Sequence, residues 1–245
     1  MEKVLLHTPE GVRDVYGKEC AVKLTIENSI NKVFNIYGYH NIQTPTFEFF
    51  DIFSKERGSV ASKNLYKFFD REGNTLVLRP DVTPSIARLV AKYYMDVKVP
   101  VKLCYNANTY INNSELQGKL KENTQLGCEL INDDSVEADA EILALVVDSL
   151  KAAGLKEFLV EIGHADFYKG LLEECGFDTE NEQELRKRIE NKNYFGVEEI
   201  LDNNNITGQL KEAFLKLPEL FGSIDVIKSA KELTDNKKAL QSIER

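Results

Sequence analysis

The chain has 245 residues, of which 42% are hydrophobic and 29% are charged, a composition ordinary for a soluble globular protein. Its formal net charge of −9 disfavours unsteered binding to tRNA or DNA, because each phosphate contact needs a lysine or arginine to displace counterions. Its four cysteines form no C-x-x-C pair and its three histidines lack ligand spacing, so we expect reduced core cysteines and no metal site.

We expect a cytoplasmic location and no membrane partner. The apolar run within residues 1–9 is too short for a signal peptide. The longest uninterrupted apolar stretch, Ile142–Val147, is far below the ~20 residues that a membrane span needs.

In chain order, the first predicted elements are a helix over 18–37, a strand over 39–44 that ends at Pro45, and a hairpin formed by 65–69 and 75–78. Thr83-Pro84 then begins a helix, with Thr83 expected as its N-cap. Hairpin-length connections favour antiparallel strands, since parallel neighbours need a crossover.

Two further strands, 101–109 and 123–131, alternate in polarity. On the second strand one face is apolar and is expected to pack on helices: Leu126, Cys128 and Leu130. The opposite face carries an amide and a carboxylate on either side of a glycine: Gln125, Gly127 and Glu129. Because glycine has no side chain, this pattern predicts open room above the sheet.

The remaining sequence turns helical. Asp134 precedes a strong helix, with Glu137 completing a possible capping box, and 158–162 is expected to be a strand. Beyond it, helical patterns cover 165–175, 181–192, 194–202, 206–216, 223–232 and 235–245. We therefore expect a mixed α/β body over 1–165 and a helical segment over 166–245. No dinucleotide or phosphate-loop motif is present.

Several motifs in order resemble the catalytic domain of the histidyl-tRNA synthetases: Pro9-Glu10-Gly11-Val12-Arg13-Asp14, Pro45, Leu78-Arg79-Pro80-Asp81-Val82-Thr83 and Gln125-Leu126-Gly127-Cys128-Glu129. The resemblance covers nearly all of residues 1–175. It implies an α+β fold, the class II aminoacyl-tRNA synthetase-like antiparallel sheet flanked by helices. It also implies a dimer formed around the first helix and Pro45.

The resemblance further implies a pocket for free histidine. Asp81 and Thr83 would meet the ammonium group, and Gln125 and Glu129 would line the same cavity. A carboxylate gives an ammonium a strong, charge-assisted hydrogen bond. Asp81 stands where the family usually has glutamate, and it could instead stabilise the helix N-terminus. Glu129 could belong to a structural network, and Tyr105 is expected to be a core residue.

The nucleotide side of the family pattern is altered. An arginine that grips the α-phosphate, a glutamate that meets adenine and a phenylalanine that stacks on it are replaced, by position, by Ile111, Asn113 and Asn123. Neutral side chains cannot supply the charge and the bidentate fork of arginine. Losing one such donor typically slows a reaction ~10²–10³-fold, so amino-acid activation is not expected.

The segment Asn108–Ser114, followed by Leu116-Gln117-Gly118, resembles the regulatory subunits of ATP phosphoribosyltransferase, which are paralogues of the synthetases. This resemblance implies a non-catalytic subunit without cofactors. It would bind histidine and the short-form catalytic subunit, as a homodimer within a hetero-oligomer, and no tRNA. The alternatives are a histidine–tRNA ligase fragment and a structural partner with a decayed pocket. The family's later motifs have no counterpart, so we expect a chain truncated relative to the family.

Overall fold

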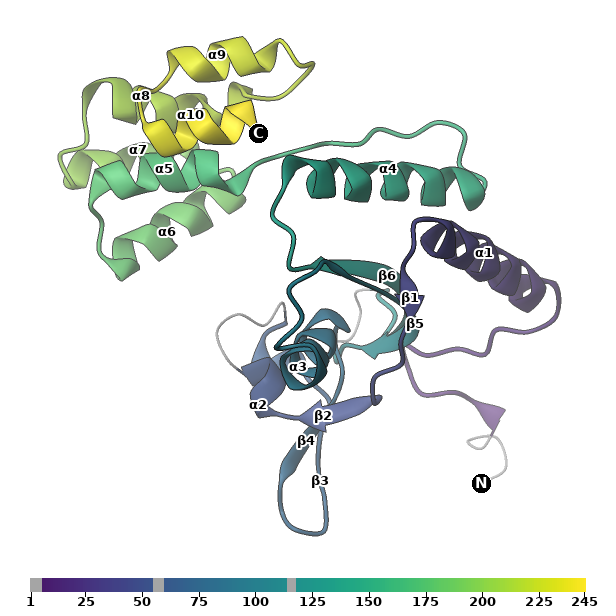
Figure 1. The fold of residues 1–245 in the computed structure, drawn as a ribbon. Coiled ribbons are helices and arrows are strands. Elements are labelled where there is room, and N and C mark those ends of the chain that lie inside the picture. Colours follow the sequence, from purple (N-terminus) through teal and green to yellow (C-terminus); the bar gives the residue numbers. More distant parts are fainter. Residues whose placement is uncertain (1–5, 55–59, 114–117) are drawn as a thin grey trace. The chain divides into compact units, whose positions relative to one another are not determined.

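The computed structural model describes residues 6–54, 60–113 and 118–245. The chain divides into two compact units, Met1–Leu159 and Val160–Arg245, which are described separately (Figure 1). The domain boundary expected at residue 165 remains a proposal. Ser114, Leu116 and Gln117, which carry part of the second resemblance, lie outside the described residues, as do residues 1–5 of the N-terminal segment.

The first unit contains two three-stranded sheets and the helices that flank them. Its helices are α1 (Gly17–Ile36), α2 (Asp51–Ser54), α3 (Thr83–Tyr93) and α4 (Val136–Ala152). Its strands are β1 (His40–Asn41), β2 (Phe47–Phe49), β3 (Lys67–Phe69), β4 (Thr75–Leu78), β5 (Val101–Tyr110) and β6 (Glu122–Ile131).

The larger sheet has the order β1-β5-β6 and the smaller sheet the order β2-β4-β3. Strands β5 and β6 pair antiparallel over their whole length, whereas the short β1 runs parallel to β5. The antiparallel pairing of β3 with β4 confirms the predicted hairpin, and α1 confirms the first predicted helix.

The two faces of the larger sheet differ as the alternation of β6 predicts. Its apolar face packs on α1 and α4, where Phe34, Cys104 and Leu145 are buried against Leu126, Cys128 and Leu130. On the opposite face, α3 covers β5, and a second cluster forms from Val82, Ile86, Val101, Leu103 and Tyr105. Strand β6 lies at the edge of this sheet, and the hydrogen bond between Thr83 and Glu129 places its polar face beside the start of α3.

Two predicted helix caps are wrong. Val82, and not Thr83, is the N-cap of α3, because the Thr83 hydroxyl donates to Glu129 on β6 instead of serving the helix. Ser135, and not Asp134, caps α4: its side chain accepts a hydrogen bond from Ala138 N at 3.1 Å. At α3 the tertiary contact with Glu129 takes the Thr83 hydroxyl, whereas at α4 the local bond from Ala138 N selects Ser135 over its neighbour Asp134.

The strand predicted at 158–162 is also wrong. The structure assigns no strand to these described residues, and Leu159 and Ile162 are 77% and 74% exposed. Their β-forming composition is not enough, because a strand needs a neighbouring edge to pair with and a face to bury.

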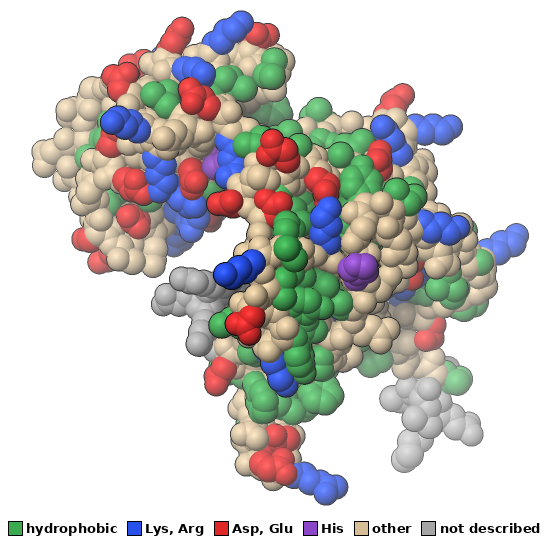
Figure 2. Space-filling model, in the orientation of Figure 1, with side chains coloured by type: hydrophobic (Ala, Val, Ile, Leu, Met, Phe, Trp, Pro, Cys, Tyr) green, Lys and Arg blue, Asp and Glu red, His purple; other side chains and the backbone are tan. Residues whose placement is uncertain are grey.

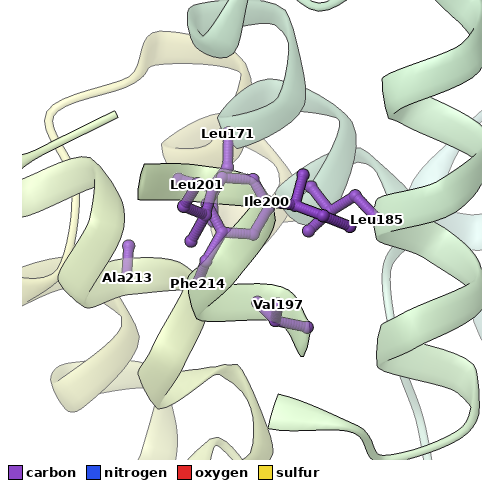
Figure 3. Close-up of a cluster of buried hydrophobic side chains, with 7 residues drawn as sticks. All are labelled: Leu171, Leu185, Val197, Ile200, Leu201, Ala213 and Phe214. Atoms are coloured by element: carbon purple, nitrogen blue, oxygen red, sulfur yellow. The ribbon is translucent and has the colours of Figure 1, made fainter. Parts of the chain in front are cut away.

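The second unit is helical, as its sequence patterns predict. It contains α5 (Ala165–Cys175), α6 (Thr179–Glu190), α7 (Tyr194–Asn203), α8 (Gly208–Lys216), α9 (Val226–Glu232) and α10 (Lys237–Glu244). Figure 3 shows its core, made by Leu171, Leu185, Val197, Ile200, Leu201, Ala213 and Phe214. Helices α5 and α10 approach closely at Gly170, where an added Cβ would lie 2.8 Å from Ala239 N.

None of the helices described combines the length and apolar character that crossing a bilayer requires.

Two arginines join the small sheet to the rest of the first unit. Arg88 on α3 forms a bidentate pair with Glu48 of β2, with contacts of 2.7 and 3.0 Å, and Glu48 is only 7% exposed. Arg79, at the end of β4, is 6% exposed, and its guanidinium donates to the backbone carbonyls of Thr44, Pro45 and Asn108 at 2.9, 3.1 and 2.8 Å. The shortest hydrogen bonds of the Arg79 guanidinium therefore go to backbone carbonyls and not to a carboxylate.

We expect Arg79→Met to lower the free energy of unfolding by about 2–4 kcal/mol, because it leaves three partly buried carbonyls without their donor. Arg71→Met, in the exposed turn between β3 and β4, is the matched control and should change it by less than about 0.5 kcal/mol. Urea denaturation measures both. Equal midpoints for the two variants would contradict a structural role for Arg79.

Candidate functional site

The structure brings three of the four predicted site residues to the N-terminus of α3. The Thr83 hydroxyl donates to Glu129 Oε1 at 2.7 Å, which links α3 to β6. Asp81 lies just before the helix, and its Oδ1 accepts from the backbone N–H groups of Val82 at 2.7 Å and Thr83 at 3.4 Å. Asp81 therefore does stabilise the helix start, while its contact with a ligand remains a prediction.

The Glu129 carboxylate is held in an environment that disfavours its charge. Burial raises the pKa of Glu129, the hydrogen bond from Thr83 lowers it, and the nearby Asp81 carboxylate raises it again, with a net upward direction. Two acidic groups close together and partly removed from water repel each other. A cation placed between them would relieve both the desolvation and the repulsion, so the cluster is suited to an ammonium or imidazolium group.

Gln125 shares the strand face of Glu129, with Gly127 between them, but the expected open room above Gly127 is wrong. Tyr105 of β5 is the direct partner of Gly127 in the sheet. A Cβ added at Gly127 would lie 2.4 Å from the Tyr105 hydroxyl oxygen and 2.5 Å from Cζ. The phenol therefore occupies the space that the glycine leaves free.

Tyr105 is the residue of this region that sequence reasoning missed. As expected, its ring belongs to the core, 5% exposed and packed in the cluster of Val82 and Ile86. Its hydroxyl end, however, reaches the site. Burial, followed by the charges of Glu129 and Asp81, raises the pKa of Tyr105 to about 12, and a hydrogen bond with Thr83 lowers it. The sequence signal for this contact was a glycine on one predicted strand opposite an aromatic residue on the neighbouring strand.

Asn113 and Asn123, which the resemblance aligns with nucleotide-contacting positions, share one acceptor next to the hairpin loop. The side-chain amides of Asn113 and Asn123 both donate to the carbonyl of Leu120, each at 3.3 Å. Residues 101–131 contain no arginine. The stem of Lys121 lies against Gly11, whose added Cβ would be 2.6 Å from Lys121 Cγ. The hairpin is thus closed by neutral amide contacts.

Two further polar side chains near the ends of helices have structural partners. Arg13 pairs with Glu19 at 2.5 Å on the surface, and His164 caps α5 by accepting from Asp166 N at 3.2 Å. Within the described ranges, no group of three or more histidine, cysteine or acidic side chains is placed to hold a metal ion.

The chain is similar to one known protein family and to several of its members. A sequence profile described as histidyl-tRNA synthetase matches residues 11–245. The chain is 46% identical over 244 residues to a protein of Ruminiclostridium cellulolyticum named ATP phosphoribosyltransferase regulatory subunit, covering 100% of this chain and 58% of the relative. A protein of the same name from Acetivibrio thermocellus is 41% identical over 238 residues, which are 97% of this chain and 57% of the relative.

A solved structure is also similar. It is a crystal structure from Bacillus halodurans, described as an ATP phosphoribosyltransferase regulatory subunit/histidyl-tRNA synthetase, with 35% identity and a TM-score of 0.88. The match covers 98% of this chain and 62% of that one. The chain therefore spans less than two thirds of the length of these relatives.

Replacing Thr83 with valine should raise the pKa of Glu129 further, because it removes the hydrogen bond that favours the ionised carboxylate. Glu129 would then hold its proton to a higher pH than in the wild type. Thr83→Ser keeps the hydroxyl and should leave the titration close to that of the wild type. Carbon-13 NMR of the side-chain carboxyls measures all three, and one common pKa would refute the coupling of Thr83 to Glu129.

Proposed function

The chain belongs to the histidyl-tRNA synthetase family and has its class II synthetase-like α+β fold, and from this premise we propose that it is a non-catalytic regulatory subunit of ATP phosphoribosyltransferase. The names of the similar proteins support this assignment. One observation carries the proposal. The carboxylates of Asp81 and Glu129 form a cluster suited to an amino acid, and the nearby hairpin has Ile111 where the resemblance places a phosphate-binding arginine. We place the protein in the cytoplasm, in histidine biosynthesis.

Histidine is the proposed ligand of the acidic cluster. Its α-ammonium would lie against Asp81 and Thr83, at the start of α3. Its imidazole would lie along the polar face of β6, which carries Gln125 and Glu129. The upward direction of the Glu129 pKa supports this arrangement, because a bound cation gains most where a carboxylate is already short of favourable contacts.

Aminoacylation is not part of the proposal. Activating an amino acid requires positive charge on the α-phosphate of ATP, and preorganised cations of this kind account for much of the rate. Here the corresponding hairpin has Ile111, and the side chains of Asn113 and Asn123 both donate to the Leu120 carbonyl. Nothing in the hairpin sequence replaces the arginine fork.

A site that binds histidine but does not activate it is suited to sensing the concentration of histidine. The proposed partner is the short-form catalytic subunit of ATP phosphoribosyltransferase, which this chain would activate and through which histidine would exert feedback. Histidine can shift the complex only by binding its two assembly states with different affinity. By linkage, the catalytic subunit must then change the affinity for histidine by the same factor.

Two alternative functions each have one or more observations in their favour and one against them. A histidine–tRNA ligase is favoured by the family profile and by the second of the two names given to the Bacillus halodurans protein, and the arginine-free hairpin counts against it. A structural partner with a decayed pocket is favoured by the capping role of Asp81. Against it, a half-buried carboxylate such as Glu129 is costly to keep without a use.

We also propose that two copies of the chain meet through the open face of the β2-β4-β3 sheet. Phe47 and Phe49 lie on β2, just after Pro45, and are 51% and 57% exposed, and the ring of Phe68 meets Phe47 edge-on with centroids 5.7 Å apart. Figure 2 shows hydrophobic side chains gathered over α3 and β2. With a charge of −9, copies of this chain repel each other unless they meet through such an uncharged surface.

The proposed function is tested by co-purifying the complete protein with a short-form transferase and assaying the transferase with and without histidine. We expect activation by this chain, inhibition by histidine, and histidine binding that weakens about 10–100-fold in Glu129→Gln, since hydrogen bonds to charged groups contribute about 1.5–3 kcal/mol. Glu137→Gln, on the exposed start of α4, is the control.

Other outcomes separate the alternatives. Histidine-dependent exchange between ATP and pyrophosphate would establish a ligase. Calorimetry that shows transferase binding but no heat with histidine would favour the structural partner.

Charging the open face should separate the copies. We expect the double substitution Phe47→Asp and Phe49→Asp to convert a dimer to a monomer in light scattering, because burying two carboxylates without partners is unfavourable. Phe69→Asp is the control, since Phe69 is 72% exposed and alternates to the other face of β3. A dimer that survives the double substitution would locate the interface elsewhere.

A further inference from the structure

Two of the four cysteines are direct cross-strand partners in the larger sheet. Cys104 on β5 and Cys128 on β6 lie opposite each other in the register of the antiparallel pair. Both are free thiols in the apolar cluster that packs on α1 and α4, where Cys104 is fully buried and Cys128 is half-buried. Because directly opposed residues of an antiparallel pair share one face of the sheet, the two side chains enter the same packing layer.

The backbone hydrogen bonds show which kind of cross-strand pair this is. Opposed residues in an antiparallel ladder alternate between pairs that exchange two backbone hydrogen bonds and pairs that exchange none. Ile111 N donates to Lys121 O at 2.9 Å, one position beyond the end of the ladder, so the bonded positions of β5 are the odd-numbered ones. The carbonyl of Cys104 accepts instead from Ile42 N at 2.9 Å, on the side of β1. Cys104 and Cys128 are therefore a non-hydrogen-bonded pair.

This kind of pair brings two side chains close enough to be bonded to each other. The Cα atoms of a non-hydrogen-bonded pair are about 4.5 Å apart, against about 5.5 Å in a hydrogen-bonded pair. A disulfide needs a Cα separation of about 4.4–6.8 Å. The two cysteines therefore stand at the short end of the range that a disulfide spans. The other two cysteines lie elsewhere, Cys20 on α1 and Cys175 on α5 of the second unit.

The surroundings of the two thiols keep them protonated and slow to react. Burial, followed by the charge of Glu129, raises the pKa of Cys128 to about 11, with smaller contributions from Cys104 and Glu141. Burial also raises the pKa of Cys104. The thiolate is the form that attacks a disulfide, so at neutral pH only a small fraction of either thiol is reactive. Of the two, the half-buried Cys128 is the more accessible to a small oxidant.

We propose that Cys104 and Cys128 are a redox modification site, at which oxidation closes a disulfide across the middle of the β5–β6 pair. The Cys128 thiolate attacks a low-molecular-weight disulfide such as oxidised glutathione, which forms a mixed disulfide and releases one small thiolate. The Cys104 thiolate then attacks the Cys128 sulfur, and the second small thiolate leaves. The two electrons pass to the oxidant, and its two thiolates take up the two protons that the cysteines lost.

A simpler role for the two cysteines is core packing alone. A free thiol behaves as a small hydrophobic side chain, which accounts for the burial of both residues. Packing alone predicts no preference among the possible pairings of the four cysteines. A cross-strand dithiol predicts that the bond between Cys104 and Cys128 forms ahead of every other pairing, and that the folded sheet accommodates it.

The test refolds the protein from urea in a mixture of reduced and oxidised glutathione, so that burial does not limit access to the thiols. Alkylation and tryptic peptide mapping then identify the bond, because the four cysteines fall in four different tryptic peptides. We expect a bond that joins peptide 103–119 to peptide 122–151, with two free thiols in place of four. The oxidised protein should also have a higher urea midpoint than the reduced protein, because the bond constrains the unfolded chain.

Two variants serve as controls. The double substitution Cys20→Ser and Cys175→Ser keeps the cross-strand pair and should form the same bond with the same rise in midpoint. Cys128→Ala removes the pair, so its midpoint should not rise on oxidation. Peptides 103–119 and 122–151 that stay unlinked in the refolded double variant would overturn the inference. A bond that forms but lowers the urea midpoint would overturn it as well, because it would show that the folded sheet does not fit the disulfide.

Discussion

The buried guanidinium of Arg79 is the constraint on which the first unit depends. Its side chain ties the segment before β2 to the end of β5 through carbonyls, and its own backbone is fixed on both sides: Arg79 N donates to Thr46 O, and Tyr110 N donates to Arg79 O. Two sheets that share no strand are thereby held in one geometry. Because a planar fork with five donors reaches several acceptors at once, no other side chain can substitute for it.

The position of Arg79 also explains where the site lies. Asp81 is two residues further on, so the same junction that locks the sheets fixes the entry into α3. Arg88 then holds the far side of that helix to β2 through Glu48. A ligand group between α3 and β6 would therefore meet walls fixed from both directions. Such rigidity favours binding, since little order remains to be imposed when the ligand arrives.

The sequence predicts features that depend on periodicity or on short connections, such as strand faces and hairpins. It does not predict which partner a side chain takes when several are available. Alternation along β6 correctly separated its apolar face from its polar one, since strand geometry allows only two faces. The hydroxyl of Thr83 had two possible uses, helix cap or contact with Glu129, and no local rule ranks them. Tyr105 was hidden for a related reason: a strand pattern shows that a ring is buried, but not what its hydroxyl reaches.

In the proposed site, Glu129 is a half-buried carboxylate, whereas the neighbouring hairpin carries no arginine. This contrast supports the proposal of sensing over that of a decayed pocket. Decay relaxes costly features, and a half-buried Glu129 beside Asp81 is a costly feature. On the hairpin, by contrast, Asn113 and Asn123 share one carbonyl acceptor, and these neutral contacts carry no such electrostatic cost. A pocket with stored electrostatic cost binds a cation more tightly than a relaxed one does. That difference in free energy is what a regulatory subunit needs in order to make its partner's activity depend on a metabolite.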